Sequence, residues 1–254
     1  MKHPGSLGLL VPAAGLGQRM GKKDLPKALI AFCDSTLLQM SIKNFVEFSD
    51  ELAFVIRSEH EELFRKHTQH LEYKRPKFIT QITANGTAEA VRLGLENMQS
   101  PWVLLVWGDH IGASRLDLQL LFNEVDNESD FLLPLVERAN PYVYFELENS
   151  ERNLDFFETK VGAPRIHFGF SDCGVFLFKK DVVLKFLKNR VSPITQPGDI
   201  KEINFLSLFS TMKSVGIKFK TLKFQDQLLT IGVNSPAELT EAQRMFCDGN
   251  TDVP

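Results

Sequence analysis

The hydrophobic positions of this chain follow two alternating spacings. In its first half, short apolar runs are each followed by a longer segment whose apolar residues lie three or four positions apart, as Val91, Leu95 and Met98 do. Short runs predict buried strands, and the wider spacing predicts amphipathic helices. The predicted strands are residues 7–14, 52–57, 77–83 and 102–107, and the predicted helices are residues 35–48, 59–71, 87–98 and 116–125.

The second half of the chain has a less regular pattern. Its predicted strands are residues 130–137, 142–148, 154–160, 173–178, 217–224 and 228–231, and its predicted helices are residues 181–189, 202–215 and 235–246. Strands that alternate with helices favour a mostly parallel sheet with helices on both faces. The sequence therefore predicts an α/β fold with a mixed, mostly parallel sheet.

Length, composition and charge narrow the class of protein. The 254 residues suit one α/β domain or two small ones, and a hydrophobic content of 43% is typical of globular proteins. A net charge of −3 gives no basic excess of the kind that a general nucleic-acid-binding protein needs. No stretch approaches the roughly 18 apolar residues of a membrane span, so neither nucleic acid nor membrane is an expected partner.

The N-terminus and the cysteines bear on the compartment. The first apolar run is short, interrupted by Gly8 and Pro12, and enters a charged loop, so we expect no signal peptide. Cys33, Cys173 and Cys247 are far apart, odd in number and without a CxxC pair, which argues against a disulfide framework or a zinc site. We expect a reducing, cytoplasmic setting.

A glycine-containing basic loop follows the first predicted strand. Residues 11–29 are VPAAGLGQRMGKKDLPKAL. Gly15 and Gly17 allow the backbone to approach a ligand closely, and successive N–H groups can form an anion site. Arg19 and Lys27 add positive charge. Because ligands of open parallel sheets bind at the carboxyl ends of the strands, the loop predicts polyphosphate binding, although neither GxxxxGK[ST] nor GxGxxG is present.

This loop, with Ala-Ala-Gly-x-Gly-x-Arg-Met followed by Leu-Pro-Lys-x-Leu, resembles the signature of the nucleotide-sugar pyrophosphorylases, which belong to the nucleotidyltransferase superfamily. The likeness is greatest to the uridylyltransferase domain of the bacterial N-acetylglucosamine-1-phosphate uridylyltransferases. It implies a Rossmann-like nucleotidyltransferase fold in one domain over residues 1–254, with a nucleotide-binding half near 1–126 and a sugar-binding half near 127–254. It also implies catalytic roles for Arg19 and Lys27 and nucleotide binding by Ala13, Ala14, Gly15 and Gly17.

A second stretch resembles the segment of this family that contacts the base. Residues 81–87 match the family's Gln-x4-Gly-Thr pattern, which implies that Gln81, Gly86 and Thr87 bind the nucleotide. An amide can pair with a base edge, and a glycine allows a close approach. The same residues are also typical of a turn in which Thr87 caps the next helix, and the two roles are compatible.

Two further stretches imply a metal site. Asp109 follows an apolar predicted strand, where a carboxylate is unfavourable unless it binds something. Gly-Val-Asn at residues 232–234 resembles a family motif, and the resemblance implies that Asp109 and Asn234 hold Mg²⁺, which prefers oxygen ligands. Alternatively Asp109 lies in a turn, and Asn234 or Ser235 caps the last helix. His110 departs from the family pattern; it could touch substrate or be a neutral loop residue, and we prefer the second interpretation.

Residues 140–145, 157–160 and 172–174 resemble the sugar pocket of the family in their order. The resemblance implies that Glu158 and Asp172 bind the sugar. Glu158 could instead pair with Lys160 or Arg165. Phe145 and Asp172 stand where the family often has glycine and asparagine, so the identity of the sugar stays open.

Together these stretches predict a Mg²⁺-dependent nucleotidyltransferase that joins a nucleoside triphosphate, with UTP favoured, to a sugar 1-phosphate. The products would be a nucleotide-sugar and pyrophosphate. Two alternatives stay open: a cytidylyltransferase that acts on a non-sugar phosphate, and a non-catalytic regulatory subunit that binds nucleotide-sugars. The oligomeric state also stays open, and a homo-oligomer is compatible with the sequence.

Overall fold

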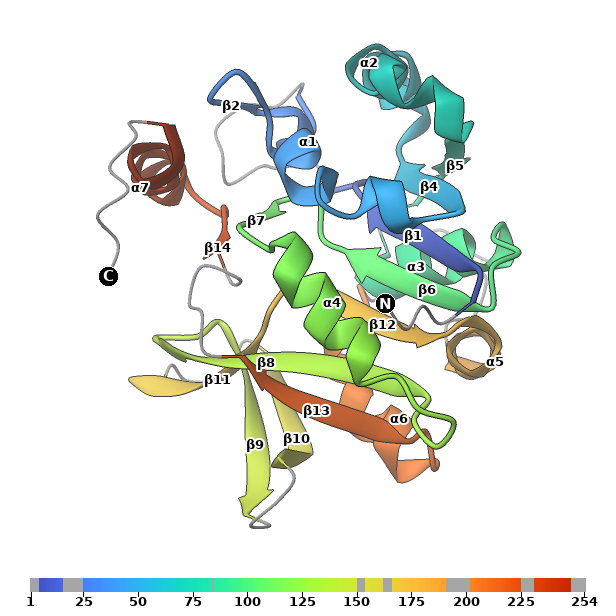
Figure 1. Ribbon diagram of the computed structural model, residues 1–254, viewed down its shortest axis with the longest axis vertical. Helices are drawn as coiled ribbons and strands as arrows, with labels where there is room; N and C mark the ends of the chain where they lie inside the picture. The colour runs from blue at the N-terminus through green and yellow to red at the C-terminus, as the bar shows by residue number, and fades with distance from the viewer. Residues whose placement is uncertain are drawn as a thin grey trace.

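The computed structural model describes residues 5–15, 25–83, 85–149, 154–161, 166–190, 202–224 and 231–247. A ten-stranded sheet runs through both halves of the chain, with helices on its two faces (Figure 1). Its strands are β1 Leu7–Pro12, β4 Glu51–Ile56, β5 Lys77–Thr80, β6 Trp102–Val106, β8 Phe131–Ala139, β9 Val143–Asn149, β10 Leu154–Val161, β11 Phe168–Asp172, β12 Val175–Lys179 and β13 Phe219–Phe224.

Two small sheets and the helices complete the described structure. The small sheets pair β2 Ala31–Phe32 with β3 Ser35–Thr36 and β7 His110–Ile111 with β14 Ile231–Gly232. The α-helices are α1 Leu37–Ile42, α2 Glu61–His67, α3 Thr87–Glu96, α4 Arg115–Asn123, α5 Lys180–Arg190, α6 Phe209–Ser214 and α7 Pro236–Cys247. The 3-10 turns are η2 Lys27–Leu29, η3 Val46–Phe48, η4 Ser58–His60, η5 Gln69–Lys74 and η6 Leu206–Leu208.

The main sheet is parallel in the first half of the chain and largely antiparallel in the second. Its strand order is β10-β9-β11-β8-β12-β6-β1-β4-β5, and β13 pairs with β8. Strands β6, β1, β4 and β5 run parallel, whereas β12 is antiparallel to β6 and β8. The predicted α/β fold with a mixed sheet is confirmed. Because β1 lies between β4 and β6, the carboxyl ends of these three strands meet at one edge of the sheet.

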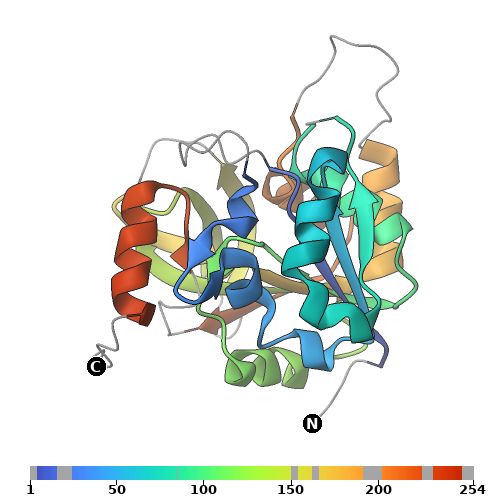
Figure 2. The same cartoon turned by 90° about the horizontal axis from the view of Figure 1, so that it is seen from above.

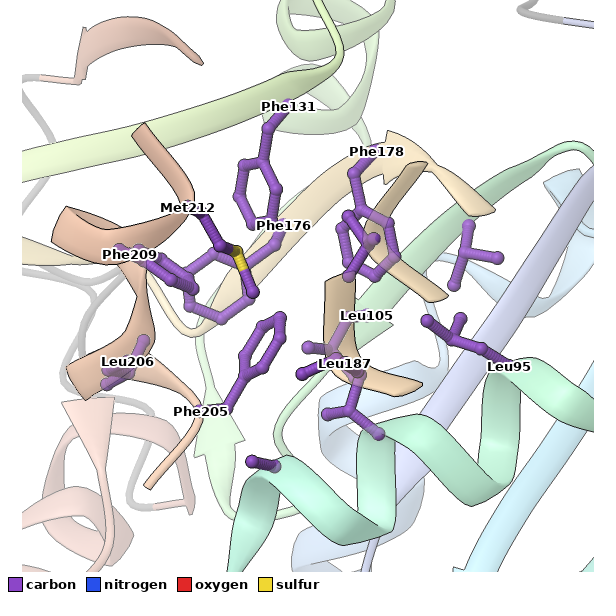
Figure 3. Packing of buried hydrophobic residues seen from close by; sticks show 14 of the residues in the cluster. Leu95, Leu105, Phe131, Phe176, Phe178, Leu187, Phe205, Leu206, Phe209 and Met212 are labelled. Carbon is purple, nitrogen blue, oxygen red and sulfur yellow. The ribbon is translucent and has the colours of Figure 1, made fainter. Parts of the chain in front are cut away.

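Alternate residues of the central strands enter two separate hydrophobic clusters. Leu10 and Leu105 belong to a cluster with α3 and α5, whereas Leu9 and Leu104 belong to a second cluster with α1 and α4. Figure 3 shows the first cluster, in which Phe131, Phe176, Phe178, Phe205 and Phe209 pack together beside Leu105, Leu187 and Met212. Full burial of one such side chain stabilises the fold by about 1.5–3 kcal/mol. Because successive residues of each strand point to opposite faces of the sheet, this burial packs helices against both faces.

Three predicted helices are shorter than their apolar spacing indicated, and the predicted helix 202–215 contains only η6 and α6. Residues 35–48 contain β3, α1 and η3, because Thr36 forms a capping box with Gln39 that fixes the start of α1 after the strand. Residues 59–71 are divided among η4, α2 and η5 in the same way. There the Thr68 hydroxyl donates a hydrogen bond to the Phe64 carbonyl at 2.8 Å, where α2 ends.

Several predicted strands also needed correction. Strand β11 lies just before the predicted strand 173–178. The pattern did not reveal it, because its first residue, Phe168, is exposed and the next two are only half-buried. Of the predicted strand 228–231, only the last residue lies within the described part of the chain. There β14 pairs with β7 outside the main sheet, so this segment does not extend that sheet. Within the described residues, no helix is both long enough and apolar enough to cross a membrane.

A disulfide joins Cys33 to Cys247, which corrects the expectation that the cysteines are unpaired. The two residues are 214 positions apart, and their Cα atoms are 5.5 Å apart. Cys33 lies at the tip of the β2–β3 hairpin and Cys247 ends α7, which stands beside that hairpin (Figures 1 and 2). The rings of Phe32 and Phe246 meet edge to face next to the bridge. Cys173 is free and buried.

Candidate active site

The predicted phosphate loop begins at the carboxyl end of β1. The backbone N–H of Ala13 donates to the carbonyl of Val55 in β4, which extends the sheet contact one residue beyond β1. Gly15 is exposed, and a Cβ placed on it would meet no heavy atom within 4 Å among the described residues. Gly17 and Arg19 lie outside the described residues. The described part of the loop thus leaves open space beside Gly15, and its predicted role in phosphate binding stays a prediction.

Lys27, Asp109 and Asn234 converge in front of this sheet edge. The Lys27 ammonium group lies on η2, donates to Oδ1 of Asn234 at 2.7 Å and forms an ion pair with Oδ2 of Asp109. Asp109 follows β6 by three residues, and Asn234 follows β14 by two. The side chains of Lys27 and Asp109 are only 18% and 23% exposed to solvent. One cation is therefore held between two oxygen ligands in a half-buried site.

The small sheet of β7 and β14 brings these residues together from distant parts of the chain. His110 pairs with Gly232, and the N–H of Val233 donates to the carbonyl of Asp109 at 3.0 Å. Asn234 does not cap α7 with its side chain, because the Ser235 hydroxyl accepts from the backbone of Glu238 instead. The Asn234 side-chain oxygen is thereby left to face Lys27.

The charge of Asp109 is stabilised by its neighbours. Burial by itself would raise the pKa of the Asp109 carboxyl group, but the hydrogen bond with His110 and the positive charge of Lys27 lower that pKa by more than burial raises it. The net result is a pKa well below the ordinary value for aspartate. Asp109 is therefore an anion across the physiological pH range, so its two oxygens are available as acceptors for a cation.

These residues fit a magnesium ion. Mg²⁺ takes oxygen ligands and keeps several coordination positions for water and substrate phosphates, so one carboxylate and one amide oxygen suffice from the protein. In this structure the same two oxygens already converge on a positive charge, the Lys27 ammonium. Within the described part of the chain, no three His, Cys, Asp or Glu side chains gather into a metal cluster. The donor set thus favours a metal shared with substrate.

In the predicted base-binding segment, residues 81–87, the helix cap differs from the expectation. Gln81 is buried, and its side-chain N–H group donates to Oδ1 of Asn85 at 3.2 Å and to the Gly86 carbonyl at 3.1 Å. Thr87 does not cap α3, because Gly86 is the N-cap residue. The Thr87 hydroxyl instead accepts from the backbone N–H of Phe205 at 2.8 Å.

Gly86 is needed for contact with the protein itself. Its φ of +96° is in the region that favours glycine, and a Cβ there would lie 2.3 Å from the backbone oxygen of Ile203. Ile203 also donates to the carbonyl of Asn85 and accepts from the N–H of Ala88. The segment around Ile203 therefore fixes the shape of the base-binding segment from the second half of the chain, a relationship with no local sequence signal.

The two predicted sugar ligands differ in how far the structure describes them. Asp172 ends β11, and its Oδ1 accepts from the Gly174 N–H at 2.9 Å. Burial raises the pKa of this carboxyl group, while His110, the Gly174 N–H and Arg138 partly offset that effect. The backbone of Glu158 lies in β10, but its side chain is outside the described structure. Asp172 and Asp109 both lie beside His110.

His110 was wrongly interpreted as a loop residue. It lies in β7, its side chain is 19% exposed, and its Nδ1 is 3.1 Å from Oδ1 of Asp109. The ring also packs against Gly174, where a Cβ would lie 2.2 Å from His110 Cδ2. The sequence did give one indication of this role. A histidine directly after the candidate metal ligand Asp109 departs from the family pattern, and a ring at that position can form a hydrogen bond with the carboxylate.

Comparison with known proteins identifies the family of the chain. Residues 9–154, more than half of the chain, match the family described as the MobA-like NTP transferase domain. The bifunctional protein GlmU of Campylobacter fetus is 24% identical over 244 residues, which cover 94% of this chain and 53% of GlmU. The chain thus spans about half the length of the curated relatives it matches.

Solved structures share the fold at low sequence identity. The nucleoside-diphosphate-sugar pyrophosphorylase of Vibrio cholerae is 17% identical with a TM-score of 0.69, covering 93% of this chain and 99% of that one. The inositol-1-phosphate CTP transferase of T. maritima is also 17% identical, with a TM-score of 0.75 and coverages of 97% and 98%. The Rossmann-like nucleotidyltransferase fold is confirmed over nearly the whole chain.

Proposed function

The chain belongs to the family of MobA-like NTP transferase domains, and we propose that it transfers a nucleotidyl group from a nucleoside triphosphate to a sugar 1-phosphate. UTP is the favoured donor, and the products are a nucleotide-sugar and pyrophosphate. The observation that carries this proposal is the convergence of the Lys27 ammonium with side-chain oxygens of Asp109 and Asn234. A cation held between two oxygens at the carboxyl edge of a parallel sheet suits substrates that carry several phosphates.

In this proposal the first half of the chain holds the nucleotide. The backbone from Ala13 to Gly17 and the side chain of Arg19 receive the β and γ phosphates. Gln81, Gly86 and Thr87 form the base side of the site. Gln81 has both amide hydrogens committed to Asn85 and Gly86, so its carbonyl oxygen is the group left to accept a hydrogen from the base. Uracil carries such a hydrogen on its ring nitrogen, as thymine and guanine also do, so this acceptor is compatible with UTP.

The second half of the chain would receive the sugar phosphate, with Glu158 and Asp172 as hydrogen-bond acceptors for its hydroxyl groups. The two halves are proposed to act as one domain, since a single sheet runs through both. The identity of the sugar is decided by the panel of sugar 1-phosphates in the assay.

The reaction is an in-line displacement. A phosphate oxygen of the sugar 1-phosphate forms a bond to the α-phosphorus, and the bond from that phosphorus to the bridging oxygen breaks, so that pyrophosphate leaves with the electron pair. No protein nucleophile is needed, because positioning and charge neutralisation lower the barrier. The Lys27 ammonium neutralises charge on the transferring phosphate. Mg²⁺, which Asp109 and Asn234 would hold, supplies further neutralisation of phosphate charge.

The test is pyrophosphate release in the presence of Mg²⁺, with each nucleoside triphosphate offered in turn against a panel of sugar 1-phosphates and choline phosphate. Release with UTP and one sugar 1-phosphate is the expected result. Release only with CTP and a non-sugar phosphate would identify a cytidylyltransferase instead. Nucleotide-sugar binding without any release across the panel would identify a regulatory subunit.

Asp109→Ala is the control for this assay. Its activity should fall by about 10²-fold or more, since removal of one group that stabilises transition-state charge costs that much or more. A cooperative thermal unfolding transition will show that the variant is folded. Full activity in folded Asp109→Ala would exclude the proposed metal site.

A further inference from the structure

His110 occupies the contact point of three segments of the proposed site. It follows Asp109 directly, its ring faces Gly174 in the turn after β11, and its strand pairs with Gly232 of β14. A Cβ on Gly174 would lie 2.2 Å from His110 Cδ2, and one on Gly232 would lie 2.8 Å from His110 Cε1. Any other residue at these two positions would collide with the ring, so both glycines leave the space that the ring fills.

The hydrogen bond between His110 and Asp109 has a defined direction. Nδ1 of His110 is 3.1 Å from Oδ1 of Asp109, while Oδ2 of Asp109 accepts from the Lys27 ammonium. A carboxylate offers only acceptors, so Nδ1 is the nitrogen that carries hydrogen and donates it. The two oxygens of Asp109 are therefore divided between two partners, and the rotation of the carboxylate is fixed.

The same ring supports the second proposed metal ligand. The Asn234 side-chain N–H donates to the Gly232 carbonyl at 3.2 Å, which orients the amide so that Oδ1 faces Lys27. A Cβ on Gly232 would lie 3.0 Å from Nε2 of His110 and 3.3 Å from the Asn234 amide nitrogen, so the ring and the amide flank one residue. His110 thus lies against the segments that carry both oxygens.

We infer that His110 is a positioning residue for the nucleotidyl transfer, which holds Asp109 through its Nδ1–H so that Oδ2 faces the cation site shared with Asn234. This inference rests on the proposed function. Hydrogen-bonding partners of metal ligands fix the orientation of those ligands, and their loss commonly costs about 10–100-fold in metal affinity or activity.

Two substitutions of His110 separate positioning from simple filling of space. Asparagine places its amide nitrogen near the position of Nδ1, whereas glutamine is larger and places its amide nitrogen near Nε2. Binding of Mn²⁺ with a non-hydrolysable UTP analogue can be followed by electron paramagnetic resonance of free Mn²⁺. We expect His110→Asn to keep the affinity within about threefold of the unmodified protein, and His110→Gln to lose about 10–100-fold. Thermal unfolding of both variants checks that they are folded.

The order of the two variants decides the inference. A ring that only fills the space between Gly174 and Gly232 would be replaced better by glutamine, so equal affinities, or a greater loss in His110→Asn, would overturn it. Asp109→Ala separates this outcome from failure of the proposed function. If Asp109→Ala binds Mn²⁺ and the analogue as well as the unmodified protein does, the metal assignment itself fails. If only Asp109→Ala loses Mn²⁺, the metal assignment stands and the role of His110 is excluded.

Discussion

The ammonium nitrogen of Lys27 donates a hydrogen bond to Oδ1 of Asn234 at 2.7 Å, although 207 positions separate the two residues. It also pairs with Oδ2 of Asp109, so one positive charge occupies the place where the two proposed metal ligands meet. A divalent cation between these oxygens must share that space with the ammonium or displace it, and like charges a few ångströms apart repel. The phosphates of a nucleotide would draw the ammonium toward themselves.

Lys27→Met should therefore change catalysis and metal binding in opposite directions. Pyrophosphate release should fall by about 10²-fold or more, because one charge that stabilises the transferring phosphate is lost. The affinity of the nucleotide-free protein for Mn²⁺ should rise, because the competing ammonium is gone. Lys43→Met, on an exposed lysine just after α1, is the matched control and should change neither quantity. A loss of Mn²⁺ affinity in Lys27→Met would show that the two cations do not compete.

The disulfide between Cys33 and Cys247 should contribute measurably to stability. It closes a loop with a sequence separation of 214, and loss of a native disulfide typically costs about 2–5 kcal/mol. Both cysteines are exposed, so a reductant can reach them. Addition of dithiothreitol should lower the melting temperature of the unmodified protein, and the double variant Cys33→Ser, Cys247→Ser should melt at that lower temperature with or without reductant.

An equal melting temperature with and without dithiothreitol would contradict a stabilising disulfide. The same experiment bears on the compartment, because disulfides rarely persist in reducing cytoplasm. Thiol labelling of protein purified under non-reducing conditions would report whether the bond forms where the protein is made.

The parts of the site that the sequence could predict are those with a local cause. Asp109 was predicted because a carboxylate directly after a buried apolar strand is costly unless it has a partner, and in the structure Lys27 and His110 are its partners. The central strands were predicted because each is apolar on both faces. Gly15 was predicted to bind phosphate from its place after β1; the structure leaves open space there, and the binding itself stays a prediction.

The remainder depended on contacts between residues that are distant in the chain. Gly86 was predicted to admit a ligand, but the neighbour that requires a glycine there is the backbone of Ile203. The pairing of Cys33 with Cys247 depends on how α7 packs beside the β2–β3 hairpin, and odd cysteine numbers carry no such information. His110 was interpreted as a loop residue because its contacts with Gly174 and Gly232, which are distant in the chain, leave no pattern in the local sequence.

Asp172→Asn should stabilise the folded protein at neutral pH. Burial raises the pKa of Asp172 above its ordinary 3.8, so the folded protein holds this proton more tightly than the unfolded chain does. The unmodified protein therefore loses stability as the pH rises from about 3.8 through the raised pKa. Asparagine keeps the acceptor for the Gly174 N–H and carries no charge. The advantage of the variant should grow with pH over this window and then level off.

Thermal unfolding of both proteins from about pH 3.8 to pH 8 would measure this difference. Each unit of pKa shift corresponds to about 1.4 kcal/mol, and one kcal/mol moves the melting temperature of a chain of this size by about 2–4 °C. A variant that is less stable than the unmodified protein at every pH would show that the carboxylate gains more from His110 and Arg138 than burial costs it.

Alanine at two glycines should separate a role in folding from a role in binding. Gly86→Ala forces a side chain into a φ of +96° and against the backbone of Ile203, and the strained backbone alone costs about 1–3 kcal/mol. Gly15→Ala meets no heavy atom within 4 Å among the described residues, and Gly15 has no positive φ. Thermal unfolding should show a clear loss of stability in Gly86→Ala and almost none in Gly15→Ala.

Calorimetric titration with UTP should show weaker binding to folded Gly15→Ala, because its methyl group occupies the space proposed for the phosphates. Unchanged UTP affinity in Gly15→Ala would remove the loop after β1 from the nucleotide site, whatever the stability of Gly86→Ala.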